Sequence, residues 1–138
     1  MYYNSYMPDS IQVSAMSSEF LQQIRLMIEE YKDEDFCLSL IEVFIRDGAR
    51  AFEQLRSSLE SGDTVVAYAA AHSLKNMLGV LRSTQGVELA ELVCTQVSGN
   101  APDPGTPESR EFQIHELLGL TASLLEASRA LVATSKKA

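Results

Sequence analysis

The 138-residue sequence lacks several features that mark common protein classes. It has no tryptophan and only two cysteines, Cys37 and Cys94, whose separation fits neither a zinc-binding spacing nor a disulfide framework. No uninterrupted apolar run approaches the roughly 18 residues that a membrane span needs. The first residues also lack the basic and apolar segments of a secretory signal. We therefore expect a soluble, cytoplasmic protein with reduced, buried thiols and no membrane association.

Proline and glycine are scarce except in one stretch. Residues 98–107 hold three of the four prolines and two of the seven glycines, which excludes a helix there. Elsewhere the apolar residues recur at the three-and-four spacing of a helix, and no segment shows the alternation of a strand. With 46% hydrophobic and 22% charged residues, the chain is typical of one folded domain. The fold class is predicted to be all-α.

Capping residues mark the boundaries of the expected helices. Ser17 or Ser18 is the expected N-cap of the first helix and Asp63 that of the third, whereas Gly62 stops the second. Expected core side chains include Val66, Leu92 and Phe112. The expected helices cover about residues 17–31, 34–61, 64–82, 84–97 and 108–133.

These helices predict an antiparallel four-helix bundle with the first helix as an additional N-terminal cap. The expected organisation is a flexible tail over residues 1–16, a bundle over 17–133 and a second tail over 134–138. The sequence shows neither an internal repeat nor a second domain.

Acidic residues are absent from one helix of an acidic protein. The formal net charge is −8, which disfavours nucleic acid and anionic membranes as partners. Yet no acidic residue lies between Asp63 and Glu88, a window that holds His72, Lys75 and Arg82. Either packing leaves few polar positions on this helix, or an anion binds there. The charge pattern alone favours neither explanation.

His72 lies opposite the apolar stripe of the third helix. At about 100° per residue, the side chains of Val66, Ala70, Leu74, Met77, Leu78 and Leu81 gather on the other side of the helix. The neighbours of His72 are small or polar, and Lys75 follows one turn later. A neutral imidazole is a good nucleophile, and an exposed ring beside a cation suits a group that a partner must reach. His115, the second histidine, has no nucleophilic or metal-binding neighbour and is expected to be structural.

The stretch from residue 44 to 79 resembles the histidine phosphotransfer (HPt) domains of multistep phosphorelays. The matching features are Leu55 and Leu59, the Gly62-Asp63 turn, and the run from Ala71 to Lys75. A weaker resemblance in the number and order of helices extends over residues 18–132. Two glycines of the family pattern are replaced, the first by Asn76 and the second by Arg82. Arg82 would either extend the helix or add a second cation near the site.

The resemblance implies a phosphocarrier and not an enzyme. His72 would accept a phosphoryl group from a receiver-domain aspartyl phosphate and relay it to another receiver, and Lys75 would stabilise the phosphoryl oxygens. The implied partners are response-regulator receiver domains and a simple or hybrid histidine kinase, with the chain itself a monomer. No cofactor is expected, and Mg²⁺ would belong to the receiver because the helix carries no carboxylate. The expected docking residues are Val65, Tyr68, Ala69, Asn76, Gly79, Arg82 and Ser83.

Two alternatives stand beside the phosphocarrier. An adaptor of the same fold would dock a receiver or a kinase without carrying phosphate, with Asn76 and Arg82 as signs of divergence. The dimerisation helices of a histidine kinase are a second alternative. In those helices an acidic residue usually follows the histidine and a proline comes soon after it. Here Ser73 follows His72, and the next proline is Pro102.

Overall fold

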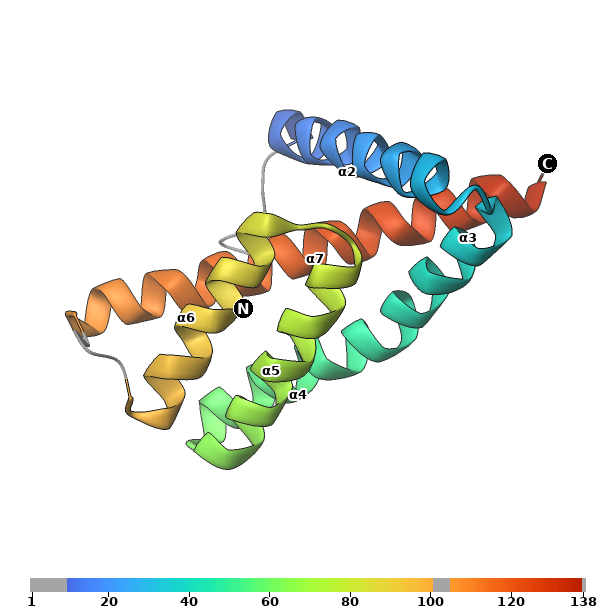
Figure 1. The fold of residues 1–138 in the computed structure, drawn as a ribbon. Coiled ribbons are helices and arrows are strands. Elements are labelled where there is room, and N and C mark those ends of the chain that lie inside the picture. Colours follow the sequence, from blue (N-terminus) through green and yellow to red (C-terminus); the bar gives the residue numbers. More distant parts are fainter. Residues whose placement is uncertain (1–9, 101–104, 138) are drawn as a thin grey trace.

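A computed structural model describes residues 10–100 and 105–137, and within these ranges the chain is helical without a strand (Figure 1). The prediction of an all-α antiparallel four-helix bundle with an extra N-terminal helix is confirmed. The helices are α2 (Ser10–Tyr31), α3 (Glu34–Val43), α4 (Ala49–Ser61), α5 (Thr64–Val80), α6 (Thr84–Ser98) and α7 (Pro107–Lys137), and a π-helical turn, η1 (Phe44–Gly48), joins α3 to α4.

The bundle is built by neighbours in sequence. α3, η1 and α4 follow one another as a single rod, α5 lies between α4 and α6, and α6 packs on α7 (Figure 1). α7 closes the bundle because it also contacts α3, η1 and α4. α2 lies outside this set, against α7 and α3. Among the described helices, none packs on one long side of α5.

The rod that contains α3 and α4 departs from the prediction at its middle. Its start is as expected, because the Asp33 carboxylate accepts a hydrogen bond from the backbone N–H of Phe36 (3.0 Å). The α-helix predicted to run on without interruption instead widens to a π-helical turn at η1. A Cβ atom on Gly48 would lie 2.9 Å from the Phe44 ring, and both residues are buried. The glycine therefore makes room for the ring inside the turn.

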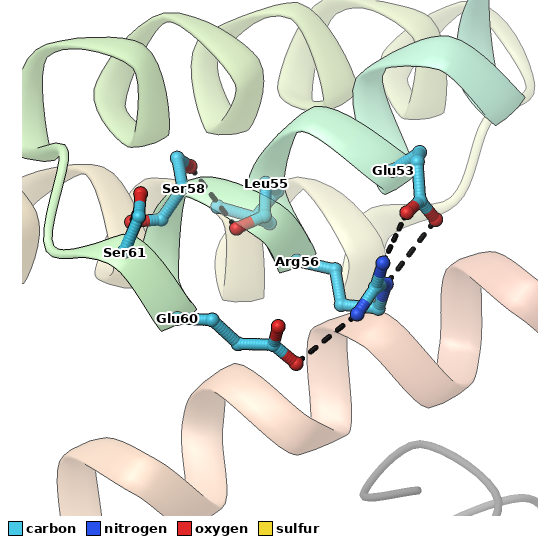
Figure 2. Close-up of polar contacts among 6 residues, drawn as sticks. All are labelled: Glu53, Leu55, Arg56, Ser58, Glu60 and Ser61. Atoms are coloured by element: carbon cyan, nitrogen blue, oxygen red, sulfur yellow. Dashed lines mark hydrogen bonds and ion pairs between the residues drawn. The ribbon is translucent and has the colours of Figure 1, made fainter.

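Ion pairs and hydrogen bonds between side chains and backbone groups run along α4 to its end. The Arg56 guanidinium lies between the carboxylates of Glu53 and Glu60, and Figure 2 shows both ion pairs. The Arg56 guanidinium also lowers the pKa of Glu53 through its hydrogen bonds. Beyond these pairs the Ser61 hydroxyl donates to the Ser58 carbonyl (3.3 Å). α4 ends there, because Gly62 adopts the left-handed conformation (φ 79°).

The core contains the small and branched side chains of α5. Ala67, Ala70, Ala71, Leu74 and Leu78 of α5 are buried, as is Leu81 directly after the helix. Alanine at the first three of these positions lets the neighbouring helices approach α5 closely. Because α5 lies between two helices, its buried face is centred further round the helix than the predicted stripe and includes Ala67 and Ala71. Val66 falls at the edge of that face.

Three expected core side chains are exposed, and these predictions were wrong. The exposed fractions are 39% for Val66, 43% for Leu92 and 57% for Phe112. On α6, Val93 and Cys94 are buried in the core of the bundle, and Leu92 beside them is exposed. Phe112 is exposed because the first turns of α7 extend past the packed part of the bundle, where most of residues 105–112 are exposed.

The terminal helices are longer than predicted. α2 begins at Ser10, so neither Ser17 nor Ser18 is its N-cap. Residues 10–17 contain neither proline nor glycine, and nothing in them stops the helix from beginning earlier. α7 continues to Lys137, through most of the segment predicted as a C-terminal tail. The rest of the two predicted tails, residues 1–9 and 138, lies outside the described residues.

α7 is a core helix of the bundle. Among the described residues, Pro107–Ser135 is the one segment long and apolar enough to cross a membrane by length and composition. Its apolar character has a different cause here, because Leu117, Leu118, Thr121, Leu124 and Leu125 are buried against the other helices. The hydroxyl of Thr121 donates to the Leu117 carbonyl (2.8 Å), so its polar group is satisfied inside the helix.

Replacement of Leu74 tests this core. Leu74 is fully buried directly beneath the exposed side of α5, so Leu74→Ala is expected to lower the free energy of unfolding by about 2–5 kcal/mol. The same truncation at the exposed Leu92 is expected to cost less than about 1 kcal/mol. Urea unfolding followed by circular dichroism measures both. Equal losses would contradict the burial pattern.

Candidate functional site

α5 begins at the predicted N-cap and holds His72 at its middle. The Asp63 carboxylate accepts a hydrogen bond from the backbone N–H of Val66 (3.1 Å), which confirms the predicted N-cap. His72 is exposed, whereas Ala71 before it and Leu74 after it are fully buried. The packing of these neighbours fixes the helix, so the imidazole projects from a rigid support into solvent.

The exposed side of α5 forms a continuous strip around the imidazole. We call this strip the His72 face. The Tyr68 ring lies one turn before His72, nearly parallel to it at 8°, with 6.1 Å between the ring centroids. Val65 adds a further apolar group, with 79% of it exposed. The members of the His72 face are Val65, Tyr68, Ala69, His72, Asn76 and Gly79, all predicted from the sequence and all exposed.

Lys75 lies on the flank of this face and is engaged with α6. Its Nζ is 2.5 Å from Oε2 of Glu91, and both side chains are partly exposed. The hydrogen bond to Glu91 and the charge of that carboxylate raise the pKa of Lys75. The prediction that Lys75 stabilises a phosphoryl group did not include this partner. The pairing depends on the register of α5 against α6, and by sequence alone Glu88 is as good a candidate as Glu91.

Arg82 and Ser83 have structural partners away from the His72 face. α5 ends at Val80, so the first of the two alternatives for Arg82, an extended helix, was wrong. Arg82 adopts a left-handed backbone conformation (φ 63°), which glycine adopts without strain. Its guanidinium is 2.5 Å from a Glu30 carboxylate oxygen and 5.9 Å from the centre of the Tyr31 ring, both on α2. The Ser83 hydroxyl accepts a hydrogen bond from the backbone N–H of Gly86 (3.2 Å) and caps α6.

Packing in the core does not require a glycine at position 79, and both cysteines are buried. A Cβ atom on Gly79 would lie 3.7 Å from Val87, an ordinary contact, so the core does not require glycine there. Cys37 and Cys94 are free thiols in the core, and burial raises the pKa of both. Across the described part of the chain, no group of three or more histidine, cysteine and acidic side chains is arranged to hold a metal ion.

The fold and the site together define a helical bundle that presents one histidine on a rigid helix. The family model for the Hpt domain matches residues 39–130, well over half of the chain, and the chain belongs to this family. Hpt domains carry phosphoryl groups in two-component phosphorelays, where they interact with receiver domains and histidine kinases. They serve as phosphocarriers and not as enzymes in their own right. Neither the comparison with curated proteins nor that with solved structures gave a match.

The backbone of Arg82 allows a test of the turn between α5 and α6. Arg82→Gly and Arg82→Ala both remove the ion pair with Glu30, but only glycine adopts a positive φ without strain. We expect the glycine variant to be the more stable of the two by about 1 kcal/mol, because a Cβ is disfavoured in this conformation. Urea unfolding of the two variants side by side measures the difference. An alanine variant as stable as the glycine variant would contradict the left-handed turn.

Proposed function

We propose that this chain is a histidine-containing phosphotransfer protein in which His72 is the phosphoacceptor. It takes a phosphoryl group from an aspartyl phosphate of one receiver domain and passes it to the aspartate of another. The observation that carries the proposal is the exposure of His72 at the middle of α5, inside the segment that matches the Hpt family. His115, the second histidine of the chain, is only 5% exposed and is inaccessible to a protein partner.

The transfer needs one nucleophile and an in-line approach. A ring nitrogen of His72 attacks the phosphorus with its lone pair as the bond between phosphorus and the aspartyl oxygen breaks. The aspartate leaves as a carboxylate with the bonding electron pair, and the imidazole keeps the proton on its second nitrogen. The reverse reaction with another receiver completes the relay. The rigid helix supplies position, which is most of what phosphoryl transfer requires of a protein.

The charges around His72 suit an anionic group. α5 carries no acidic side chain, so a phosphoryl group on the ring meets no like charge from its own helix. Lys75, one turn away on the flank of the His72 face, is the cation placed to stabilise the phosphoryl oxygens. Any Mg²⁺ used in the reaction belongs to the receiver domain in this proposal. The setting that fits these partners is the cytoplasm.

The His72 face also suits a docked protein. Tyr68 and Val65 are exposed apolar groups beside the histidine, and aromatic and apolar anchors of this kind form the centres of protein interfaces. A receiver domain seated on these residues would bring its aspartyl phosphate to the ring. We expect the chain to act as a monomer that leaves the His72 face free for the receiver domain.

Replacement of the proposed phosphoacceptor is the primary test. His72→Gln is expected to abolish phosphoryl uptake and to leave the fold unchanged, because the side chain is exposed. Intact mass spectrometry at neutral pH, after incubation with phosphorylated receiver domains, measures the acid-labile adduct. Wild-type protein is expected to gain one phosphoryl group. Uptake by the glutamine variant would refute the assignment, and a folded wild-type protein that accepts no phosphoryl group from any donor would favour the adaptor.

Asn76 tests how the departure from the family pattern affects docking. Its side chain is exposed one turn after His72, at a position where the family has glycine. Asn76→Gly is expected to increase the rate of transfer from a receiver several-fold, because it removes bulk beside the ring. It should also lower the free energy of unfolding by up to about 1 kcal/mol, the cost of glycine inside a helix. Rapid-quench kinetics measure the rate, and a slower variant would show that the asparagine amide assists transfer.

A further inference from the structure

The ion pair between Lys75 and Glu91 links the proposed phosphoacceptor helix to its neighbour. Lys75 belongs to α5 and Glu91 to α6, and 2.5 Å separates Nζ from Oε2. About a third of the lysine side chain and about half of the glutamate side chain are exposed. Exposed ion pairs contribute little to stability, so stability alone does not account for the Lys75–Glu91 pair. Its position beside His72 suggests a role in the chemistry.

Glu91 changes the charge that a phosphoryl group would meet. With Glu91 in place, the positive charge of Lys75 is already balanced by a carboxylate from α6. A phosphoryl group on His72 adds negative charge next to Lys75, because its oxygens are anionic. The single ammonium group of Lys75 would then have two anions to satisfy, and the two anions repel each other.

We propose that Glu91 is a positioning residue that competes with the phosphoryl group for the ammonium group of Lys75, and so limits how strongly His72 retains the phosphoryl group. The inference rests on the proposed function of His72. A carrier must release its cargo to the next receiver, and a cation already engaged with Glu91 holds that cargo less tightly. Glu91 thus favours transfer onward over storage on the histidine.

The step affected is the reversible transfer itself. A ring nitrogen of His72 gains the bond to phosphorus, and the receiver aspartate leaves as a carboxylate with the electron pair of the broken bond. Atoms and charge balance without another reactant. Glu91 takes no part in bond making, and it acts only by changing the charge available to the product through Lys75.

The test is the equilibrium constant for transfer between a receiver domain and the full chain. Glu91→Gln removes the carboxylate charge and keeps the size of the side chain. This change is expected to shift the equilibrium about three- to fivefold toward the phosphorylated chain, a size in keeping with a partly exposed charge pair. The ratio is measured from both directions by intact mass at neutral pH, with one receiver that phosphorylates the wild type, at concentrations where complexes are a minor fraction.

Two controls separate this effect from a general change in charge. Glu88→Gln removes the same charge from an exposed position one turn earlier on α6 and is expected to shift the equilibrium much less. Lys75→Gln is expected to shift it away from the chain. Adding Glu91→Gln to that variant should then have little further effect, because the ammonium group for which Glu91 and the phosphoryl group compete is gone.

The outcomes distinguish the two proposals. A wild-type chain that accepts no phosphoryl group refutes the proposed function and the inference with it. A wild-type chain that is phosphorylated, with Glu91→Gln and wild type at the same equilibrium, refutes only the inference. Equal shifts from Glu88→Gln and Glu91→Gln, or a full effect of Glu91→Gln without Lys75, would also overturn it.

Discussion

The burial of one face of α5 between α4 and α6 is the constraint on which the site depends. Ala67, Ala70 and Ala71 are small enough for the two neighbouring helices to approach closely, and Leu74 and Leu78 fill the core below them. With these positions buried, the pitch of the helix leaves His72 on the opposite, open side. The exposure of the imidazole is thus a consequence of the core. No separate interaction has to hold the ring out.

Charge is distributed to match this geometry. The chain is strongly acidic, yet α5 has no acidic side chain, and the carboxylate that pairs with Lys75 belongs to Glu91 of α6. This arrangement keeps the histidine accessible to an anion and also places a carboxylate on the lysine beside it. In our proposals, the same pair of helices provides both attraction for a phosphoryl group and a limit on that attraction.

The features set by local sequence were predictable. The Asp63 cap, the exposure of His72 and the members of the His72 face follow from capping chemistry and helical spacing, which act within a few residues. Features that depend on how helices meet were not predictable. The partner of Lys75 needs the register of α5 on α6, and the contact of Arg82 with α2 joins residues far apart in sequence. Leu92 was misplaced for the same reason, since its helix turns Val93 and Cys94 inward.

The most direct measurement of the central claim places the phosphoryl group on one of two histidines. With imidazole nitrogens labelled with ¹⁵N, nuclear magnetic resonance follows His72 and His115 separately while a phosphorylated receiver is added. The account predicts coupling between phosphorus and one ring nitrogen of the exposed His72, with the buried His115 unphosphorylated. Phosphorus coupled to His115, or a phosphorylated chain with no change at His72, would contradict it.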